Sequence, residues 1–421
     1  MSFQQGLSGL NAASKSLEAI GNNVANSGTV GFKQSTVQFA DIYASSLTGT
    51  GAAEVGIGVQ VARVAQLFSQ GTISASNNPL DMAINGGGFF RMSTNGAITY
   101  QRNGQFQLDK EGFIENASGA HLTGYVANAA GVLVNGNPAE LQINAADLPP
   151  TATANYELTL TLDSRKTDLT EAGFDPNDST TFSDSTSTPV YDSLGNSHVL
   201  RTFYVKTAGG EWSVFATNDG VPIVPSSYVP VIPPATDPAY IPLGTMSFDS
   251  SGGLTGTVPS PLIADMAVST GATSPFAIAI NPTGTQQFAQ DFSVTKQKPD
   301  GYSSGSLTGF SVSDDGLIVG RYTNGRTATL GQVILTTFAN PNGLQNIGDN
   351  QWVETSASGV PLTSTPGTSG LGSVQSSRVE ESNVDLTAEL VNMITAQRVY
   401  QANAQTIKTQ DQILQTLVNL R

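Results

Sequence analysis

Two serine motifs in this sequence match patterns that occur at nucleophilic active sites. The first is G-x-S-x-G at residues 301–305, which would place Ser303 on a sharp turn between a strand and a helix. That chemistry also needs a histidine later in the chain, whereas the chain's two histidines, His121 and His198, both precede the motif. The second motif, S-x-x-K at residues 293–296, lacks the K-T-G that accompanies it in serine enzymes. We therefore expect no catalytic residue and no enzymatic activity.

Three further patterns could bind a phosphate group or a metal ion. The run Gly86–Gly88 is followed by two phenylalanines rather than by the Lys-Ser/Thr of a phosphate-binding loop, so it predicts a tight turn into a buried strand. Residues Asp175–Asp178 place oxygen atoms near calcium-loop spacing, but the glycine and the closing glutamate of such a loop are missing. The two histidines are far apart in sequence and do not by themselves predict a zinc site. We expect no bound cofactor and no bound metal.

The composition restricts the class of protein. The 421 residues suffice for two or three domains, and the formal charge of −15 argues against binding to nucleic acid or to an anionic membrane surface. The chain has no run of about 18 apolar residues that could span a membrane. Its first residues lack the basic and apolar regions of a secretory signal peptide. We therefore expect neither membrane insertion nor a cleaved signal peptide.

The longest regular pattern in the chain lies in residues 385–421. Steps of three and four residues alternate along it, and neither Pro nor Gly interrupts it, which predicts a helix on the order of 55 Å long with Asp385 as its N-cap. Residues 3–24 repeat the same spacing, so we expect the two helices to pair as a coiled-coil stalk. The expected seam of that stalk consists of Phe3, Leu7, Leu10, Leu17, Val24, Leu386, Leu390, Met393, Tyr400, Ile407, Leu414 and Val418.

Several apolar residues of the C-terminal helix lie off this seam. They are Val391, Val399, Ile413 and Leu420, and they would face water in an isolated pair of helices. One explanation is a neighbouring segment of the same chain. The other is that helices of further subunits cover this back face in a polymer, which the low charge and the many Gln and Asn residues of the helix favour. We therefore expect these four residues to form an inter-subunit back face.

The middle of the chain consists of short apolar runs separated by turn residues, a pattern that predicts short strands. Asn-Gly pairs, such as Asn95-Gly96, separate short apolar runs and predict hairpins, as does the turn at 194–196 within residues 189–206. The expected fold is mixed and mainly β, with two nested β-rich domains. The expected divisions are 1–26, an N-terminal stalk helix; 27–79, an irregular, linker and strand segment; 80–147 with 291–357, a discontinuous inner β domain; 148–290, an inserted outer β domain; 358–384, a linker; and 385–421, the C-terminal stalk helix. Gly/Ser-rich residues 44–53 and 361–373 are expected to be flexible.

Both ends of the chain resemble a known family. Residues 10–26, closed by Gly31–Lys33, resemble the N-terminal signature of the bacterial flagellar rod and hook proteins. Residues 80–90 and 100–106 are similar to the core β motif of that family, and residues 381–421 look like its C-terminal helix. The resemblance covers both ends of the chain and is weaker between them.

The middle of the chain also resembles the hook-type members of the family. Residues 190–198 and 211–212 are similar to the inserted domain of these members, which the shorter rod proteins lack, whereas the Pro-rich segment 222–242 matches no family segment. The resemblance implies a structural subunit that leaves the cell unfolded through the flagellar type III export apparatus, without a cleaved signal. It implies self-assembly into a curved tube that acts as a universal joint. The implied partners are the flagellar rod, the hook cap and the hook-filament junction proteins.

Two other functions remain open at this point. A distal rod protein belongs to the same family and would form a straight, rigid tube. An exported β-rich protein that binds glycans belongs to a different class. A polymer that is curved rather than straight would favour the hook-type subunit over the rod protein.

Overall fold

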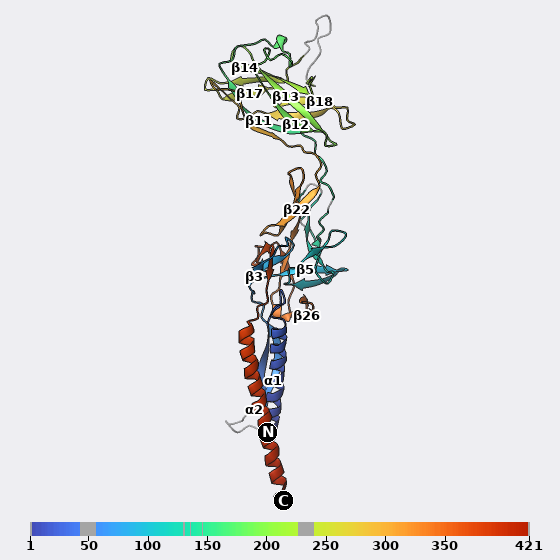
Figure 1. Ribbon diagram of the computed structural model, residues 1–421, viewed down its shortest axis with the longest axis vertical. Coiled ribbons are helices and arrows are strands. Elements are labelled where there is room, and N and C mark those ends of the chain that lie inside the picture. The colour runs from blue at the N-terminus through green and yellow to red at the C-terminus, as the bar shows by residue number, and fades with distance from the viewer. Residues whose placement is uncertain are drawn as a thin grey trace. The chain divides into compact units, whose positions relative to one another are not determined.

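The computed structural model describes residues 2–42, 56–128, 131–134, 136–144, 146–225 and 240–419. The chain folds as two compact units. Unit 1 comprises Met1–Ala145, Thr308–Arg321 and Thr327–Arg421, and unit 2 comprises Ala146–Leu307 and Tyr322–Arg326. The fold is mainly β with a long helix near each end of the chain, as expected, and both helices belong to unit 1 (Figure 1).

The two helices form where the sequence predicts them. Helix α1 spans Ser2–Ala25 and helix α2 spans Leu386–Asn419. The expected N-cap of α2 is present, because Oδ1 of Asp385 accepts hydrogen bonds from the backbone N–H groups of Thr387 at 2.9 Å and Ala388 at 3.1 Å. The helices run side by side along much of their length (Figure 1).

A β hairpin packs along α1. Its strands, β1 (Ser35–Ile42) and β2 (Gly58–Gln66), are antiparallel. Two side chains of α1 form hydrogen bonds with the backbone around the start of β2. Nε2 of Gln5 donates to the carbonyl of Gly56 at 2.6 Å, and Oγ of Ser8 accepts the N–H of Val59 at 3.2 Å. Helix α1 therefore lies against both α2 and this hairpin.

The large sheet of unit 1 is built around a two-residue hairpin. The turn Asn95-Gly96 joins β5 to β6, and both turn residues have positive φ (51° and 87°), which confirms the predicted hairpin. The strands of this sheet are β5 (Phe89–Thr94), β6 (Ala97–Gln101), β7 (Gln107–Leu108), β8 (Ile114–Glu115), β9 (His121–Val126), β10 (Ala139–Glu140), β22 (Leu307–Val312), β23 (Leu317–Tyr322), β24 (Thr327–Val333), β25 (Leu335–Thr337), β26 (Gln345–Gly348), β27 (Gln351–Val353) and β28 (Leu362–Ser364).

An aromatic cluster forms one core of unit 1. Phe89, Tyr100, Phe338 and Trp352 are all buried and meet edge to face, with Phe68 packed against them. These residues come from strands β5, β6 and β27 and from two loops, so the cluster joins segments that are far apart in sequence.

Two short strand pairs connect the segment before α2 to the first part of the chain. Strand β4 (Met82–Asn85) pairs with β29 (Ser373–Ser376), and β3 (Ile73–Ala75) pairs with β30 (Arg378–Glu380). The expected linker at 358–384, with its Gly/Ser-rich part 361–373, is therefore wrong as a flexible connection. Strands β28, β29 and β30 all lie in it, because its Gly and Ser residues serve the tight turns between these short strands.

Unit 2 consists of two sheets that share one core. Strand β11 alternates between buried Tyr156, Leu158, Leu160 and Leu162 and more exposed residues, as a strand with one buried face does. The first sheet contains β11 (Asn155–Asp163), β18 (Leu262–Met266), β19 (Phe276–Asn281), β20 (Gln286–Phe288) and β21 (Ser293–Pro299). The second contains β12 (Asp184–Tyr191), β13 (Ser197–Lys206), β14 (Glu211–Asn218), β15 (Val221–Pro222), β16 (Gly244–Phe248) and β17 (Leu254–Val258).

Both sheets contribute to the buried cluster of unit 2, which includes Trp212, Leu200, Leu262 and Ile278. The hairpin predicted around residues 194–196 is confirmed as β12 paired with β13. Short 3-10 helices occur at Glu171–Gly173 and Pro341–Gly343.

The boundary of the inserted domain differs from the expected one. Residues 291–307 were expected in the inner domain, but they belong to unit 2, because β21 pairs antiparallel with the central strand β11. Residues 293–299 contain Val294 as their one aliphatic residue among polar ones, so no apolar period identifies the strand or its partner, and sequence alone could not assign it to a sheet.

Some expectations concern residues outside the described part of the chain. They are the Gly/Ser-rich segment 44–53, residues 226–239 of the Pro-rich segment, and the last two residues of the expected C-terminal helix, Leu420 and Arg421.

Candidate assembly surface

Helices α1 and α2 are antiparallel and meet through small residues. A Cβ placed on Gly6 would lie 3.1 Å from Cγ1 of Ile407, and a Cβ placed on Gly9 would lie 2.8 Å from Oδ1 of Asn403. Residue numbers therefore increase along α1 where they decrease along α2. Glycine at both positions lets the two helix backbones approach closely.

Polar side chains join the helices nearer the β domain. Nδ2 of the buried Asn23 donates to Oε2 of Glu389 at 3.1 Å and to the carbonyl of Ser35 at 2.8 Å. The other carboxylate oxygen of Glu389 accepts a hydrogen bond from Nε2 of Gln34 at 2.8 Å. Because Glu389 is 3% exposed, these bonds satisfy a carboxylate that burial would otherwise destabilise.

The face that α1 turns toward α2 is therefore not the expected seam. Gly6, Gly9, Ala13 and Asn23 are buried or contact α2, whereas Phe3 and Leu7 are 47% and 44% exposed. Leu10, Leu17 and Val24 are half-buried. The spacing of three and four residues is the expected one, but the stripe starts one residue earlier, which on a helix is a rotation of about 100°.

Helix α2 shows a similar shift. Met393 and Ile407 of the expected seam are half-buried, but Leu386 and Leu390 are both 45% exposed, and Tyr400 is 37% exposed. Glu389 and Ala396 are less exposed than the residues on either side of them, and Asn403, about two turns further on the same side of α2, contacts Gly9 of α1. The seam prediction is therefore wrong at Phe3, Leu7, Leu386 and Leu390, because small and polar residues occupy the contact instead.

The last turns of α2 extend past the start of α1. Helix α1 has 24 residues and α2 has 34. With Gly6 opposite Ile407, the first residue of α1 lies opposite about residue 411, since both helices rise equally per residue. Figure 1 shows α2 continuing beyond the N-terminus. Leu414 and Val418, two further members of the expected seam, are 54% and 74% exposed in this overhang.

The expected back face of α2 is also exposed in the single chain. Val391, Val399 and Ile413 are 58%, 48% and 49% exposed, and Leu420 lies outside the described residues. The members of the expected seam that are at least 44% exposed join them as apolar side chains on several sides of the two helices. We call this set the assembly surface. Its members are Phe3, Leu7, Leu386, Leu390, Val391, Val399, Ile413, Leu414 and Val418.

An apolar groove of about 410 Å³ lies beside this surface. It is formed where α1, α2 and the β1–β2 hairpin meet, and small residues of α1 line its floor. The lining includes Gly9, Ala12, Ala13, Phe39, Val59 and Val399. A groove of this kind can accept an apolar side chain from another molecule.

A buried ion triad holds the base of the helices to the β domain. Nζ of Lys33 contacts Oε1 of Glu380 at 2.6 Å, and Nε of Arg102 lies 3.8 Å from the other carboxylate oxygen. The side chains of Lys33 and Glu380 are 0% exposed and that of Arg102 is 3% exposed. Nζ of Lys33 also donates to the carbonyl of Ser69 at 2.8 Å, and Oε1 of Glu380 accepts the N–H of Gly71 at 2.9 Å.

The triad carries two positive charges and one negative charge. Burial lowers the pKa of Lys33, although the nearby carboxylate of Glu380 raises it, and burial likewise lowers the pKa of Arg102. The three residues come from the segments after α1, after β6 and before α2. The triad thus ties both helical ends of the chain to the sheet of unit 1.

The serine motifs lie in structural positions. Residues 301–305 form a loop with isolated bridges to residues 148 and 151, and strand β22 follows it. A nucleophile elbow would need a helix at that place. In the second motif, Nζ of Lys296 contacts the carboxylate of Glu157 on the neighbouring strand at 2.7 Å. Both motifs therefore belong to the strand framework of unit 2.

The candidate ligand-binding patterns also have structural explanations. Gly86 and Gly88 have φ of 118° and 120° and lead into the buried strand β5, which confirms the predicted turn. Oδ1 of Asp175 accepts the N–H of Asn177 at 2.9 Å, and Oδ1 of Asp178 accepts the N–H of Thr180 at 2.9 Å. These carboxylates stabilise local turns.

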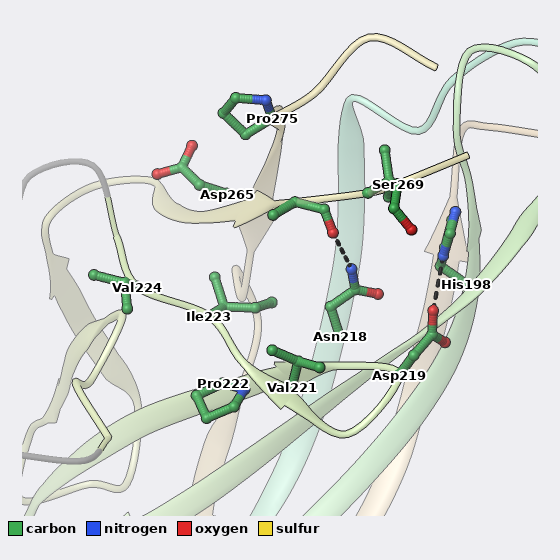
Figure 2. Close-up of a pocket in the computed structure, with 12 residues that line it drawn as sticks. His198, Asn218, Asp219, Val221, Pro222, Ile223, Val224, Asp265, Ser269 and Pro275 are labelled. Atoms are coloured by element: carbon green, nitrogen blue, oxygen red, sulfur yellow. Dashed lines mark hydrogen bonds and ion pairs between the residues drawn. The ribbon is translucent and has the colours of Figure 1, made fainter. Parts of the chain in front are cut away.

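Unit 2 contains a pocket of about 610 Å³ beside His198 (Figure 2). The ring of His198 lies between two carboxylates, with Nδ1 2.8 Å from Oδ2 of Asp219 and Nε2 3.4 Å from Oδ2 of Asp192. Nδ2 of Asn218 donates to the carbonyl of Ala267 at 2.8 Å. Asp219 has a positive φ of 47° in the turn between β14 and β15, so these contacts hold that turn against β13.

In the part of the chain that the structure describes, no helix has an apolar stretch long enough to cross a lipid bilayer.

The residues that sequence reasoning missed are those of the actual helix contact and of the ion triad. Gly6, Gly9 and Ala13 show the three-and-four spacing in the sequence, so a search for small residues at that spacing would have found them. Lys33 and Glu380 carry no such signal, because their pairing depends on strands that meet only in the fold.

Four models of flagellar protein families match the chain. "Flagella basal body rod protein" matches residues 3–33, and "Flagellar hook protein FlgE/F/G D1 domain" matches residues 83–157. "Flagellar basal body protein FlaE D2 domain" matches residues 159–302, within unit 2, and "Flagellar basal body rod FlgEFG protein C-terminal" matches residues 375–420, which include α2.

Relatives of the same kind match over the whole length. The flagellar hook protein FlgE of Salmonella typhimurium is 39% identical over 428 residues, covering 100% of both chains, and that of Escherichia coli is 39% identical over 425 residues with the same coverage. The hook protein FlgE of Treponema pallidum is 30% identical and covers 100% of this chain and 99% of its own.

A solved structure supports the fold. The crystal structure of the Helicobacter pylori flagellar hook protein FlgE2 covers 73% of this chain and 100% of its own, with a TM-score of 0.54 at 13% identity. Sequence identity over the full length, the matched domain models and the fold agree. The chain belongs to the family of the flagellar hook protein FlgE.

Proposed function

We propose that this chain is a structural subunit of the flagellar hook and that it polymerises through its assembly surface. The observation that carries this proposal is the assembly surface itself, nine large apolar side chains that are at least 44% exposed on two paired helices. Exposed apolar patches of this kind mark surfaces that bind other protein molecules. In a helical polymer of identical subunits, each copy would cover the surface of its neighbours.

Two features support burial between copies of this chain. The overhang of α2 presents Ile413, Leu414 and Val418 beyond the end of α1, where no segment of α1 can cover them. The groove between α1, α2 and the β1–β2 hairpin offers an apolar seat on the same pair of helices. The overhang of one copy packing on the paired helices of the next would generate a continuous tube.

The wider role of the chain is part of the same proposal. A hook subunit would transmit torque from the rod to the filament through a curved tube that bends as a universal joint. It would reach the cell exterior through the flagellar type III export apparatus, without a cleaved signal peptide. Its other partners would be the rod, the hook cap and the hook-filament junction proteins, and its role would be structural rather than enzymatic.

Deletion of residues 412–421 tests the proposal. Purified full-length protein should form curved tubes in the electron microscope under polymerising conditions, whereas the shortened chain should remain monomeric. Both units should unfold as in the full-length protein, because the deleted residues lie beyond α1. Tubes formed by the shortened chain would refute the proposal, and straight tubes from the full-length chain would favour the rod protein instead.

A point variant sharpens the test. Leu414→Ser removes one apolar side chain that should be buried between subunits, a loss of about 2 kcal/mol per contact. The concentration needed for polymerisation should therefore rise at least about tenfold. Gln412→Ser is the matched control, since it changes an exposed polar residue on the same turn, and it should leave that concentration unchanged.

A further inference from the structure

Unit 1 brings a histidine and carboxylates together at the start of strand β9. Ligand atoms of Asp109, Glu115 and His121 lie within 4.8 Å of one another. Asp109 follows β7, Glu115 belongs to β8 and His121 opens β9, so the turn after β7 and the two following strands supply one residue each. The sequence gives no sign of this cluster, because its members are separated by turns whose geometry only the fold defines.

Contacts on three sides orient the imidazole of His121. Its Nδ1 lies 2.8 Å from Oε2 of Glu140, and its ring stacks on Phe113 with the centroids 4.8 Å apart and the planes 6° from parallel. In the neutral tautomer that donates from Nδ1 to this carboxylate, Nε2 carries a lone pair. Nε2 lies on the side of Asp109, and a ligand atom of Glu115 lies within 4.8 Å of the ligand atoms of both residues. A histidine that binds a metal ion through one nitrogen commonly donates the other to a carboxylate in this way.

The spacing of the cluster fits an ion better than a direct hydrogen bond. Nε2 of His121 lies 3.8 Å from Oδ2 of Asp109, which is too long for a hydrogen bond. Two ligands that each lie about 2.0–2.2 Å from one Zn²⁺ are separated by such a distance at an open coordination angle. The second oxygen of Asp109 is already used, because Oδ1 accepts the N–H of Phe113 at 2.7 Å.

The charge of the cluster also favours a cation. Glu115 receives a hydrogen bond from the neutral amide of Gln107 at 3.0 Å. Asp109, Glu115 and Glu140 place three carboxylates around one histidine, and no ion pair of the described residues joins a Lys or an Arg to them. A divalent ion would neutralise this excess of negative charge.

We propose that Asp109, Glu115 and His121 form a binding site for a divalent transition-metal ion of the Zn²⁺ class, with Glu140 orienting the histidine. One imidazole nitrogen and two carboxylate oxygens suit Zn²⁺, whereas Ca²⁺ and Mg²⁺ prefer oxygen ligands alone. The half-buried ligands leave the remaining coordination position to water. The ion would join the β7–β8 hairpin to β9 and so stabilise the edge of the sheet, independently of the assembly surface.

Titration of the untagged full-length monomer with Zn²⁺ tests the site, using calorimetry and, in parallel, the visible absorption of Co²⁺. The wild type should bind one equivalent, and millimolar Mg²⁺ should not displace it. His121→Gln should lose this binding, and Glu140→Gln should weaken it by about 10–100-fold. His198→Gln is the matched control, because it removes the chain's other histidine and lies in unit 2, and it should bind as the wild type does.

A His121→Gln variant that takes up Zn²⁺ as tightly as the wild type would overturn the proposal. Melting without metal shows whether each variant folds. If His121→Gln does not fold, Glu115→Gln replaces it, because its amide oxygen can still accept the hydrogen bond from Gln107. Zn²⁺ should also raise the melting temperature of unit 1 and leave that of unit 2 unchanged, and equal shifts in both units would contradict a site on β9.

Discussion

Replacing one residue of the buried ion triad should destabilise unit 1 by an amount that depends on which charge is removed. Glu380→Gln leaves Lys33 and Arg102 as two buried cations without a counter-charge. Breaking a buried ion pair from one side costs about 3–5 kcal/mol. Lys33→Met instead leaves Glu380 with Arg102, a pair without net charge, so no buried charge is left uncompensated.

The charges of the triad predict which of the two variants loses more stability. Glu380→Gln should lower the free energy of unfolding of unit 1 by about 3–5 kcal/mol, and Lys33→Met should lower it by less. Burial lowers the pKa of Lys33, which means that burying its charged form costs free energy. Methionine does not bear this cost, so it offsets part of the stability that Lys33→Met loses. The double variant should cost less than the sum of the two single variants, since one interaction is lost in both.

Urea unfolding can measure unit 1 alone. The chain has two tryptophans, Trp352 in unit 1 and Trp212 in unit 2, and both are buried. In a Trp212→Phe background, the fluorescence of Trp352 reports the unfolding of unit 1. Lys15→Met serves as the control, because Lys15 forms an exposed pair with Glu18 that should contribute less than about 1 kcal/mol.

Two outcomes would refute this reasoning. A larger loss for Lys33→Met than for Glu380→Gln would show that the net charge of the triad does not govern its energy. Additive losses in the double variant would show that Lys33 and Glu380 do not interact, in spite of their 2.6 Å contact.

Three further predictions concern local features. Gly21→Ala should stabilise α1 by up to about 1 kcal/mol, seen as increased helix content by circular dichroism, because a Cβ there meets nothing within 4 Å. Gly104→Ala should unfold or strongly destabilise unit 1 in the Trp352 assay, because its Cβ would lie 1.6 Å from the carbonyl oxygen of Met82. Hydrogen bonds from Arg165 lower the pKa of Asp163 to about 2, so its stabilisation of unit 2 is present above about pH 4 and is lost as the pH falls toward 2. Thermal melts should show this acid loss in the wild type and not in Asp163→Asn.

The sequence determined the elements of this protein to a large extent. The two helices, the N-cap at Asp385, the hairpin at Asn95-Gly96 and the nesting of one β unit inside another follow from local patterns of spacing, capping and turn residues. Such patterns act over a few residues, so they can be read along the chain. The likeness of the terminal motifs to the flagellar rod and hook family was equally local.

The face on which the helices meet was not determined in this way. Apolar residues at three-and-four spacing occur on more than one stripe of α1 and α2, and the period of a pattern does not state which stripe is covered by the same chain. Gly6 and Gly9 permit a closer approach than Leu7 does, so the tertiary contact uses the small stripe of α1 and leaves Phe3 and Leu7 exposed. We expect the exposed members of the predicted seam to contact a neighbouring molecule.

The sequence by itself determined which segments are helical, which are extended and where most turns lie, because these depend on residues adjacent in the chain. Only the tertiary structure decided that β21 joins unit 2, that Lys33 reaches Glu380, and that His121 meets Asp109 and Glu115. Each of these contacts depends on which strands become neighbours in a sheet. That choice is made by burial and by backbone hydrogen bonding over the whole unit, and no local pattern encodes it.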